Sequence, residues 1–288
     1  ALLISLQQLD EDEEEVMSQF ETLNVEIDGR IAWVTFDHPP INLLDMQMIS
    51  EIDQLSKDLE ANTSIHVAVF QSADPDFFIA HADVELIRQL PTDITERPTE
   101  LNIYVAALER LRKLPIATIA KIAGIARGGG SEFLWSLDMR FAAIGRTTLG
   151  QPEVAIGILP SGSGSARLPN LVGRARALEI SLACEDFSAE LAQAYGLINR
   201  AVPADELDDL VERIAIRIAS FPKTAIQSAK LAIDAALEDP TDALLEEAHQ
   251  FNLLRGTSEA QERMAAFMSE GAQTREGELD LNSVIARL

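Results

Sequence analysis

The chain has 288 residues, 47% of them hydrophobic and 24% charged, which is ordinary for a globular protein with a full hydrophobic core. Its formal net charge of -24 repels phosphate backbones and anionic lipid headgroups, so a nucleic acid and a membrane surface are both disfavoured as partners. A single cysteine excludes an intrachain disulfide framework and a cysteine metal cluster. No run approaches the roughly 20 apolar residues of a membrane span, and we expect a cytoplasmic protein.

Residues 1–22 predict an acidic extension with few residues that could pack against a core. Their apolar start has no basic flank and runs directly into the acids at 10–15, which is typical neither of a secretory signal nor of a transit peptide. Short β-rich runs then flank Asp28-Gly29, a pattern that indicates a hairpin.

The next stretch alternates helical and strand patterns. Asp45 is placed to cap a helix whose apolar positions are Met48, Ile52, Leu55 and Leu59. Further along, the sequence predicts a short buried strand at 67–70, an irregular or broken helix at 84–100, a helix from 101 to about 115, and a strand at 116–122.

Three glycines at 128–130 separate that strand from a helix expected to begin near Ser131, and further strands follow at 139–144 and 147–149. Strand, turn and helix recurring at short range favour an α/β architecture. From about residue 165 the pattern becomes helical, with apolar stripes within 207–218, 225–237, 241–254 and 258–268.

The triple glycine has a chemical meaning as well as a structural one. Glycines let backbone N–H groups approach a ligand closely, and the start of a helix favours an anion there. The segment has neither the lysine of a nucleotide-binding P-loop nor the glycine spacing of a dinucleotide site. Taken alone, it also fits an ordinary tight turn.

Several neighbouring segments give the triple glycine a family context. They stand in this order along the chain: His38-Pro39-Pro40 with Asn42, Phe77 to Asp83, Pro115 to Glu132, Gly150 to Pro160 with Gln151-Pro152-Glu153, and Tyr195 to Val202. With these segments the sequence resembles the crotonase (enoyl-CoA hydratase/isomerase) superfamily, from about Val25 to about Met268.

The resemblance implies a fold and an assembly. Residues 23–205 would form a crotonase-like spiral of repeated ββα units that carries an acyl-CoA site. Residues 206–288 would form a C-terminal helical region used for oligomerisation, as a homotrimer or a dimer of trimers. The expected ligand is an acyl-CoA thioester. Coenzyme A is then part of the substrate, and no separate cofactor is expected.

The resemblance also implies an oxyanion hole made by the backbone N–H groups of Ala82 and Gly129. Two fixed amide donors bind the charge that develops on a thioester oxygen more strongly than they bind the neutral carbonyl, so they lower the barrier. The adjacent residues expected at the substrate are Ala80, His81, Asp83 and Gly128.

Glu132 and Glu153 match the two acids that the family's hydratases use. Adding water to a conjugated thioester needs one group that takes a proton from water and another that delivers a proton to the α-carbon. By this resemblance Glu132 activates the water and Glu153 protonates the α-carbon, which predicts a lyase, an enoyl-CoA hydratase. The histidines are scattered without metal-ligand spacing, so no metal is expected.

The sequence departs from the family pattern at two places. His81 stands where the family commonly has glycine, and its side chain either crowds the pocket or faces away and supports the loop, the interpretation we favour because the oxyanion role belongs to the backbone. An imidazole there also brings a group that titrates near neutral pH. Ser161 to Ser165 replaces a glycine-rich stretch, which implies that it shapes the acyl pocket.

Alternatives remain open at this point. Relatives with one of the two acids carry out isomerisation, hydrolysis or decarboxylation, so an enoyl-CoA isomerase that uses Glu153 alone is the first alternative. A catalytically inactive scaffold on the same fold, with the acidic N-terminus recruiting a partner, is the second. The acyl group is not specified by these motifs.

Overall fold

The structure, a computed structural model, describes residues 17–94, 96–237 and 239–288. Two sheets organise the chain, with strand orders β1-β2-β3-β5-β7-β10 and β4-β6-β8-β9. The larger sheet contains β1 (Leu23–Asp28), β2 (Ile31–Phe36), β3 (Val67–Ser72), β5 (Ala117–Ile122), β7 (Met139–Ala143) and β10 (Arg200–Val202). The smaller sheet contains β4 (Phe77–Ile79), β6 (Ile125–Arg127), β8 (Thr148–Gly150) and β9 (Phe187–Ser188).

From β3 to β8, consecutive strands alternate between the two sheets, so this part of the chain advances as a spiral. The pairs β3–β4, β5–β6 and β7–β8 each place one strand in the larger sheet and the next in the smaller one. Equivalent strands of successive turns pair in parallel. Helices follow each pair: α2 (Val84–Gln89) and α3 (Ile103–Lys113), then α4 (Gly129–Trp135), then the 3-10 turn η1 (Glu153–Ile156) and α5 (Gly164–Val172). The predicted α/β spiral of ββα units is confirmed.

The local predictions near the N-terminus hold in detail. β1 and β2 pair antiparallel across the Asp28-Gly29 turn. The Asp45 carboxylate accepts a hydrogen bond from the backbone N–H of Met48 at 2.9 Å, and α1 (Met46–Ala61) begins there. The four apolar positions predicted for this helix are all buried, so its register follows from its sequence pattern.

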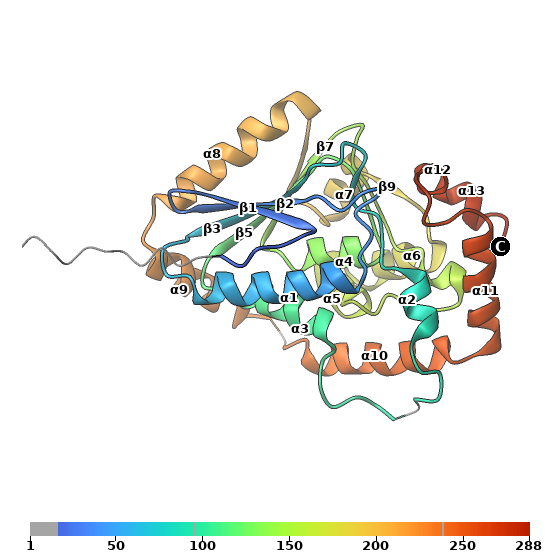
Figure 1. Cartoon of the computed structure of the whole chain (residues 1–288). Coiled ribbons are helices and arrows are strands. Elements are labelled where there is room, and N and C mark those ends of the chain that lie inside the picture. The colour runs from blue at the N-terminus through green and yellow to red at the C-terminus, as the bar shows by residue number, and fades with distance from the viewer. Residues whose placement is uncertain (1–16, 95, 238) are drawn as a thin grey trace, which may run out of the picture.

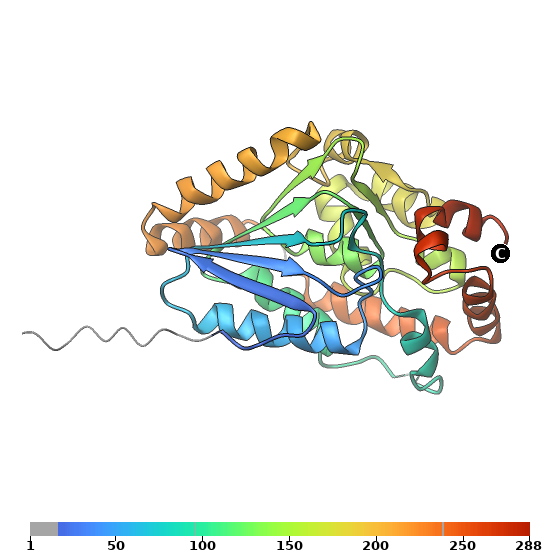
Figure 2. The same cartoon turned by 45° about the horizontal axis from the view of Figure 1, so that its top comes forward.

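Helices cover both faces of the larger sheet (Figure 1). On one face α1, α3 and α4 enclose the main core, in which the ring of Phe133 packs edge-on against Phe36 with centroids 5.3 Å apart. On the other face lies α8 (Leu207–Ala219), whose buried side includes Leu210 and Val211. Figure 2 shows the sheet between α8 and α1 from a second direction.

The C-terminal helices wrap the spiral instead of forming a separate unit. They are α9 (Lys223–Asp234), α10 (Thr241–Arg255), α11 (Ser258–Ser269), α12 (Arg275–Leu279) and α13 (Leu281–Ile285). α10 packs on α5, and α11 packs on α2 and η1. Because α8 already belongs to the sheet packing, the predicted boundary at 205/206 marks a change of secondary structure and no break in packing. Short elements α6 (Arg174–Ala183), α7 (Ala189–Tyr195) and η2 (Ala204–Glu206) complete the fold.

The prediction for residues 1–22 is only partly open to comparison, because residues 1–16 lie outside the described residues. For 17–22 the expectation of little packing is wrong. Met17 and Phe20 pack against the main core, and the N–H of Thr22 donates to the Glu51 carboxylate at 2.8 Å. Within the described part of the chain, no helix is both long enough and apolar enough to cross a bilayer.

Candidate active site

The triple glycine forms a turn in which a side chain would be strained or would clash. Gly128 has φ +48°, and a Cβ there would collide with Glu153 Oε1. A Cβ on Gly130 would collide with the carbonyl oxygen of Ile79, which is backbone and cannot move aside. Helix α4 begins at Gly129, two residues before the predicted start, because close backbone approach and not a side-chain cap defines this helix N-terminus.

Two backbone N–H groups converge beside this turn. The N–H of Leu44 donates to the carbonyl of His81 at 2.9 Å, and the N–H of Asp83 donates to the carbonyl of Leu44 at 3.0 Å, so the N–H of Ala82 between them points away from Leu44. Gly129 is the first residue of α4, where an N–H has no intrahelical acceptor. A Cβ on Gly129 would lie 3.6 Å from the nitrogen of Ala82, which places the two donors side by side.

Both donors open onto a cavity of about 400 Å³ whose lining also includes Glu132 and Glu153. The cavity is otherwise mainly apolar. Its apolar lining includes Leu86, Ile87, Ile103, Ile158, Leu159 and Phe251. An apolar pocket with a few converging polar groups is the usual form of a small-molecule site. The structure thus brings together the four residues that the sequence motif predicted for the oxyanion hole and the acid pair.

Glu132 lies in the first turn of α4 and is 3% exposed. Its Oε1 accepts hydrogen bonds from the N–H of Gly162 at 2.9 Å and from the N–H of Gly164 at 2.8 Å. Burial raises the pKa of Glu132 to about 7, although these amides and the nearby Arg167 act in the opposite direction. Ser161 and Gly162 line the cavity, and the segment around them also holds the Glu132 carboxylate.

Glu153 enters the cavity from η1, directly after Gln151-Pro152. Burial, followed by the negative charges of Glu132 and Glu247, raises the pKa of Glu153 well above its usual value. Both acids therefore have raised pKa values, and that of Glu132 lies close to neutrality. Two buried acids with raised pKa values beside one cavity can exchange protons with a bound substrate and with water near neutral pH.

Two supporting residues were not found from the sequence. The hydroxyl of Tyr104 on α3 donates to the carbonyl of Gly129 at 2.7 Å inside the protein. Glu247 on α10 accepts hydrogen bonds from the N–H groups of Ser163 at 2.7 Å and Ala166 at 2.8 Å. It thereby fixes the segment whose amides bind the Glu132 carboxylate. Neither residue belongs to a local motif, because each contact joins segments far apart in the chain.

The remaining predicted site residues take different positions. Asp83 lines the cavity and caps α2 by accepting from the N–H of Glu85 at 2.9 Å. Gly128 lies at the base of the turn, against Glu153. Ala80 and His81 are buried behind the loop and are not part of the cavity lining, which differs from the expectation that they contact substrate. The backbone of Ala80 is instead hydrogen-bonded to neighbouring segments. The His81 side chain faces away from the cavity and supports the loop that carries Ala82.

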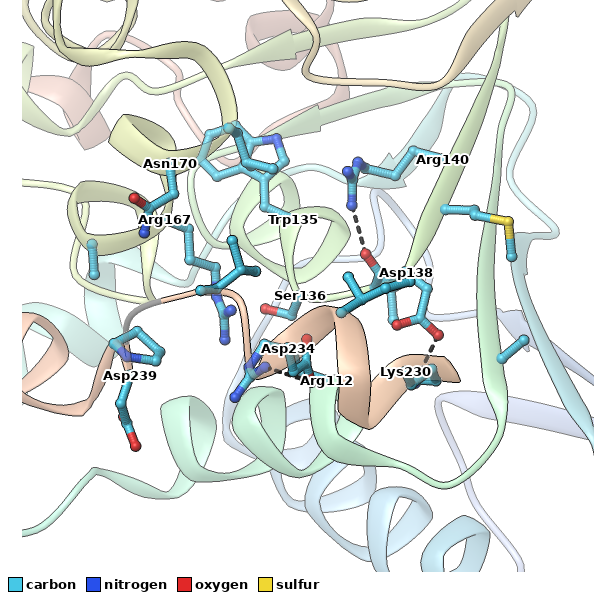
Figure 3. A pocket seen from close by; sticks show the side chains of 18 residues that line it. Arg112, Trp135, Ser136, Asp138, Arg140, Arg167, Asn170, Lys230, Asp234 and Asp239 are labelled. Carbon is cyan, nitrogen blue, oxygen red and sulfur yellow. Dashed lines mark hydrogen bonds and ion pairs between the residues drawn. The ribbon is translucent and has the colours of Figure 1, made fainter. Parts of the chain in front are cut away.

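A second cavity of about 540 Å³ lies among α3, the end of α4, α5 and α9 (Figure 3). None of the four predicted catalytic and oxyanion residues lines it. Lys230 is paired there with Asp138 at 2.7 Å and Arg112 with Asp234 at 3.0 Å, whereas Arg140 donates to backbone carbonyls. Among the described residues, no cluster of three or more His, Cys, Asp or Glu side chains is placed to hold a metal ion.

Comparison with known proteins agrees with this geometry. The family model for enoyl-CoA hydratase/isomerase matches residues 26–275. The short-chain-enoyl-CoA hydratase of Clostridium acetobutylicum is 30% identical over 85% of this chain and 94% of its own length. The crotonyl-CoA hydratase of Syntrophomonas wolfei is 29% identical over 87% of this chain and 96% of its own.

A solved structure from Streptomyces avermitilis, of a protein provisionally named an enoyl-CoA hydratase, is 38% identical. It superposes with a TM-score of 0.85 over 93% of this chain and 98% of the other. Family model, relatives and solved structure each cover most of the chain. The chain belongs to the enoyl-CoA hydratase/isomerase family.

Proposed function

We propose that this protein is an enoyl-CoA hydratase, a lyase that adds water across the conjugated double bond of an enoyl-CoA thioester. One observation carries the proposal: two buried glutamates, both with raised pKa values, line the same cavity as the backbone amides of Ala82 and Gly129. Relatives named short-chain-enoyl-CoA hydratase and crotonyl-CoA hydratase support it.

The proposed reaction assigns each group a step. The thioester oxygen accepts hydrogen bonds from the N–H groups of Ala82 and Gly129. Glu132, as a carboxylate, takes a proton from water while the water oxygen bonds to the β-carbon. The electron pair moves onto the thioester oxygen, where each amide donor of this kind is worth about 2.7–4 kcal/mol. Glu153, as an acid, then delivers a proton to the α-carbon, and proton exchange with solvent restores both acids.

The cavity also indicates what kind of acyl group fits. Beyond the acids its walls are mainly Leu, Ile, Pro and Phe side chains, which favour a hydrocarbon chain over a polar one. Water addition changes no oxidation state overall and needs no electron acceptor. The proposed reaction therefore uses no cofactor other than the coenzyme A that the substrate carries.

The direct test incubates the protein with a short-chain and a branched enoyl-CoA and follows the loss of absorbance of the conjugated thioester. We expect the absorbance to fall and the product to gain the mass of one water. A shifted double bond without that gain would replace the hydratase by an isomerase. Binding of coenzyme A thioesters without turnover of any of them would indicate the inactive scaffold.

We also propose that the protein acts in the cytoplasm as a homotrimer or a dimer of trimers. Three apolar side chains on and just after α9 support an interface there: Leu231, Ile233 and Leu237 are 61%, 66% and 60% exposed. Sedimentation equilibrium should give three or six times the mass of the chain, and a monomer at micromolar concentration would contradict this assembly.

A further inference from the structure

The His81 side chain joins the oxyanion loop to the C-terminal end of the chain. Its Nδ1 lies 2.7 Å from the carbonyl oxygen of Ala82, and its Nε2 lies 2.9 Å from Oε1 of Glu278 on α12. The two side chains are 5% and 0% exposed. His81 and Glu278 are 197 positions apart in the sequence, so this contact is purely tertiary.

The two partners determine the protonation of the imidazole. A carbonyl oxygen only accepts hydrogen bonds, so Nδ1 carries a proton. An ionised Glu278 also accepts, so Nε2 carries a proton too, and the ring is an imidazolium. Burial alone opposes this charge, but the Glu278 carboxylate outweighs burial and raises the pKa of His81.

Other groups hold Glu278 in place. The N–H of Gln273 donates to its Oε1 at 2.7 Å, and Arg127 on β6 donates to its backbone carbonyl at 2.8 Å. The side-chain amide of Gln273 donates to Asp83 Oδ1 at 2.8 Å, on the same loop as Ala82. An apolar cluster seals the contact and contains Val84, Ala272, Leu281 and Val284. Residues 270–288 are therefore fastened to the loop by several independent contacts.

These contacts bear directly on the direction of the Ala82 N–H. The peptide before Ala82 is held because the His81 carbonyl accepts from the N–H of Leu44 at 2.9 Å. The peptide after Ala82 is held because its carbonyl accepts from His81 Nδ1. The Ala82 N–H belongs to the first of these peptides, and the His81 contact holds the backbone on its other side, so that the loop keeps the N–H directed into the cavity.

We propose that His81 and Glu278 are positioning residues that hold the Ala82 amide in its oxyanion-binding orientation, so that this orientation depends on the docked C-terminal segment 270–288. The inference rests on the oxyanion role assigned to Ala82 in the proposed function. It gives His81, which stands where the family commonly has glycine, a specific task. Neither residue lines the cavity.

The test uses butyryl-CoA, a saturated thioester that the proposed reaction cannot convert, labelled with ¹³C at the thioester carbon. Isotope-difference infrared spectra report how strongly the bound carbonyl is polarised. The full-length variants are Glu278→Gln and His81→Gly, with Glu276→Gln as the matched control, since Glu276 is an exposed glutamate on the same helix. Hydration kinetics of a short-chain enoyl-CoA are measured on the same preparations.

In the wild type the carbonyl band should shift to lower frequency on binding. Glu278→Gln and His81→Gly should lose much of that shift and about tenfold in kcat, with KM changed by less than about twofold. Glu276→Gln should match the wild type. If Glu278→Gln does not fold, Glu278→Asp replaces it, because aspartate keeps the charge on a shorter side chain. The same losses of band shift and of kcat are then expected.

The two possible failures are distinct. If folded variants keep the full band shift, the positioning role is overturned, whatever the wild-type activity. If the wild type adds no water but its band shift is present and is lost in the variants, the hydratase assignment fails while the positioning role stands.

Discussion

The Gly162 N–H donates to Glu132 Oε1 at 2.9 Å, and a Cβ on Gly162 would overlap Glu132 Oε2 and lie 3.0 Å from its Cδ. The same glycine thus holds the carboxylate and leaves room for it. Gly164 repeats the arrangement, with its N–H 2.8 Å from Oε1 and a Cβ that would lie 2.7 Å from that atom. The position of the proposed base is therefore determined by backbone from a distant loop.

Gly162→Ala should keep the fold and lose activity. Gly162 does not have a positive φ, so alanine suits its backbone, but the new methyl must push the Glu132 carboxylate aside. A displacement approaching 1 Å costs on the order of 10²-fold in rate. We expect kcat for hydration to fall by about that factor. Ser220→Ala, at an exposed serine outside the cavity, is the control and should stay near wild type; equal losses in both variants would show that the Gly162 methyl does not act through Glu132.

The pH profile of activity should follow the two buried acids. Burial raises the pKa of Glu132 to about 7, and this base acts only when ionised, so kcat/KM should rise as pH increases through that region. Burial and the neighbouring carboxylates raise the pKa of Glu153, which must be protonated, so activity should fall again at higher pH. The apparent pKa values of the rising and falling parts of the profile describe the coupled pair of acids and not either acid alone. A profile that is flat through neutrality would count against this assignment.

Tyr104→Phe should destabilise the protein more than the matched change at the other tyrosine. The Tyr104 hydroxyl is buried and donates to the Gly129 carbonyl, so its loss removes a buried hydrogen bond and should cost about 0.5–1.5 kcal/mol of unfolding free energy. Tyr195 bonds Glu179 at the surface, and Tyr195→Phe should cost less than about 0.5 kcal/mol. Urea unfolding of both variants measures the difference, and similar losses would show that the Tyr104 bond adds little.

The contact of His81 with Glu278 should make stability depend on pH in a defined direction. Although burial opposes both charges, the pair raises the pKa of His81 above its usual 6.5 and lowers that of Glu278 below its usual 4.5. The His81 contribution is complete below its unfolded pKa and is lost as pH rises through the raised folded pKa. The Glu278 contribution is complete above its unfolded pKa and is lost as pH falls through the lowered folded pKa.

The unfolding free energies of wild type and Glu278→Gln should therefore differ most between about pH 4.5 and pH 6.5, by roughly 3 kcal/mol. The difference should shrink on both sides of that window. Arg127 also faces Glu278 and is paired with Asp186. A difference that is constant with pH would show that the pair is not ionised in the folded protein.

The sequence was sufficient where the signal is local. The Asp28-Gly29 turn and the Asp45 cap each act over a few residues, and the apolar spacing of α1 fixes its buried face. The spiral itself was predicted from the family resemblance, because the pattern of a single segment does not indicate to which of two sheets its strand belongs. Ala82, Gly129, Glu132 and Glu153 were found because family motifs surround them.

The missed features are tertiary. Met17 and Phe20 are isolated apolar residues in an acidic stretch, and the Glu51 carboxylate that holds the backbone beside them lies on α1. The start of α4 shifted because a run of glycines carries no cap signal. Tyr104, Glu247 and Glu278 reach the site from α3, α10 and α12, and no short pattern marks a residue whose partner lies so far along the chain.

The most direct measurement compares the rate of water addition to a short-chain enoyl-CoA in Glu132→Gln and Glu153→Gln, with Glu259→Gln on the surface of α11 as the control. Each cavity variant should lose at least about 10²-fold in kcat while the control stays at the wild-type rate. Full hydration by Glu132→Gln alongside an inactive Glu153→Gln would contradict the two-acid mechanism, because a single acid would then carry the chemistry.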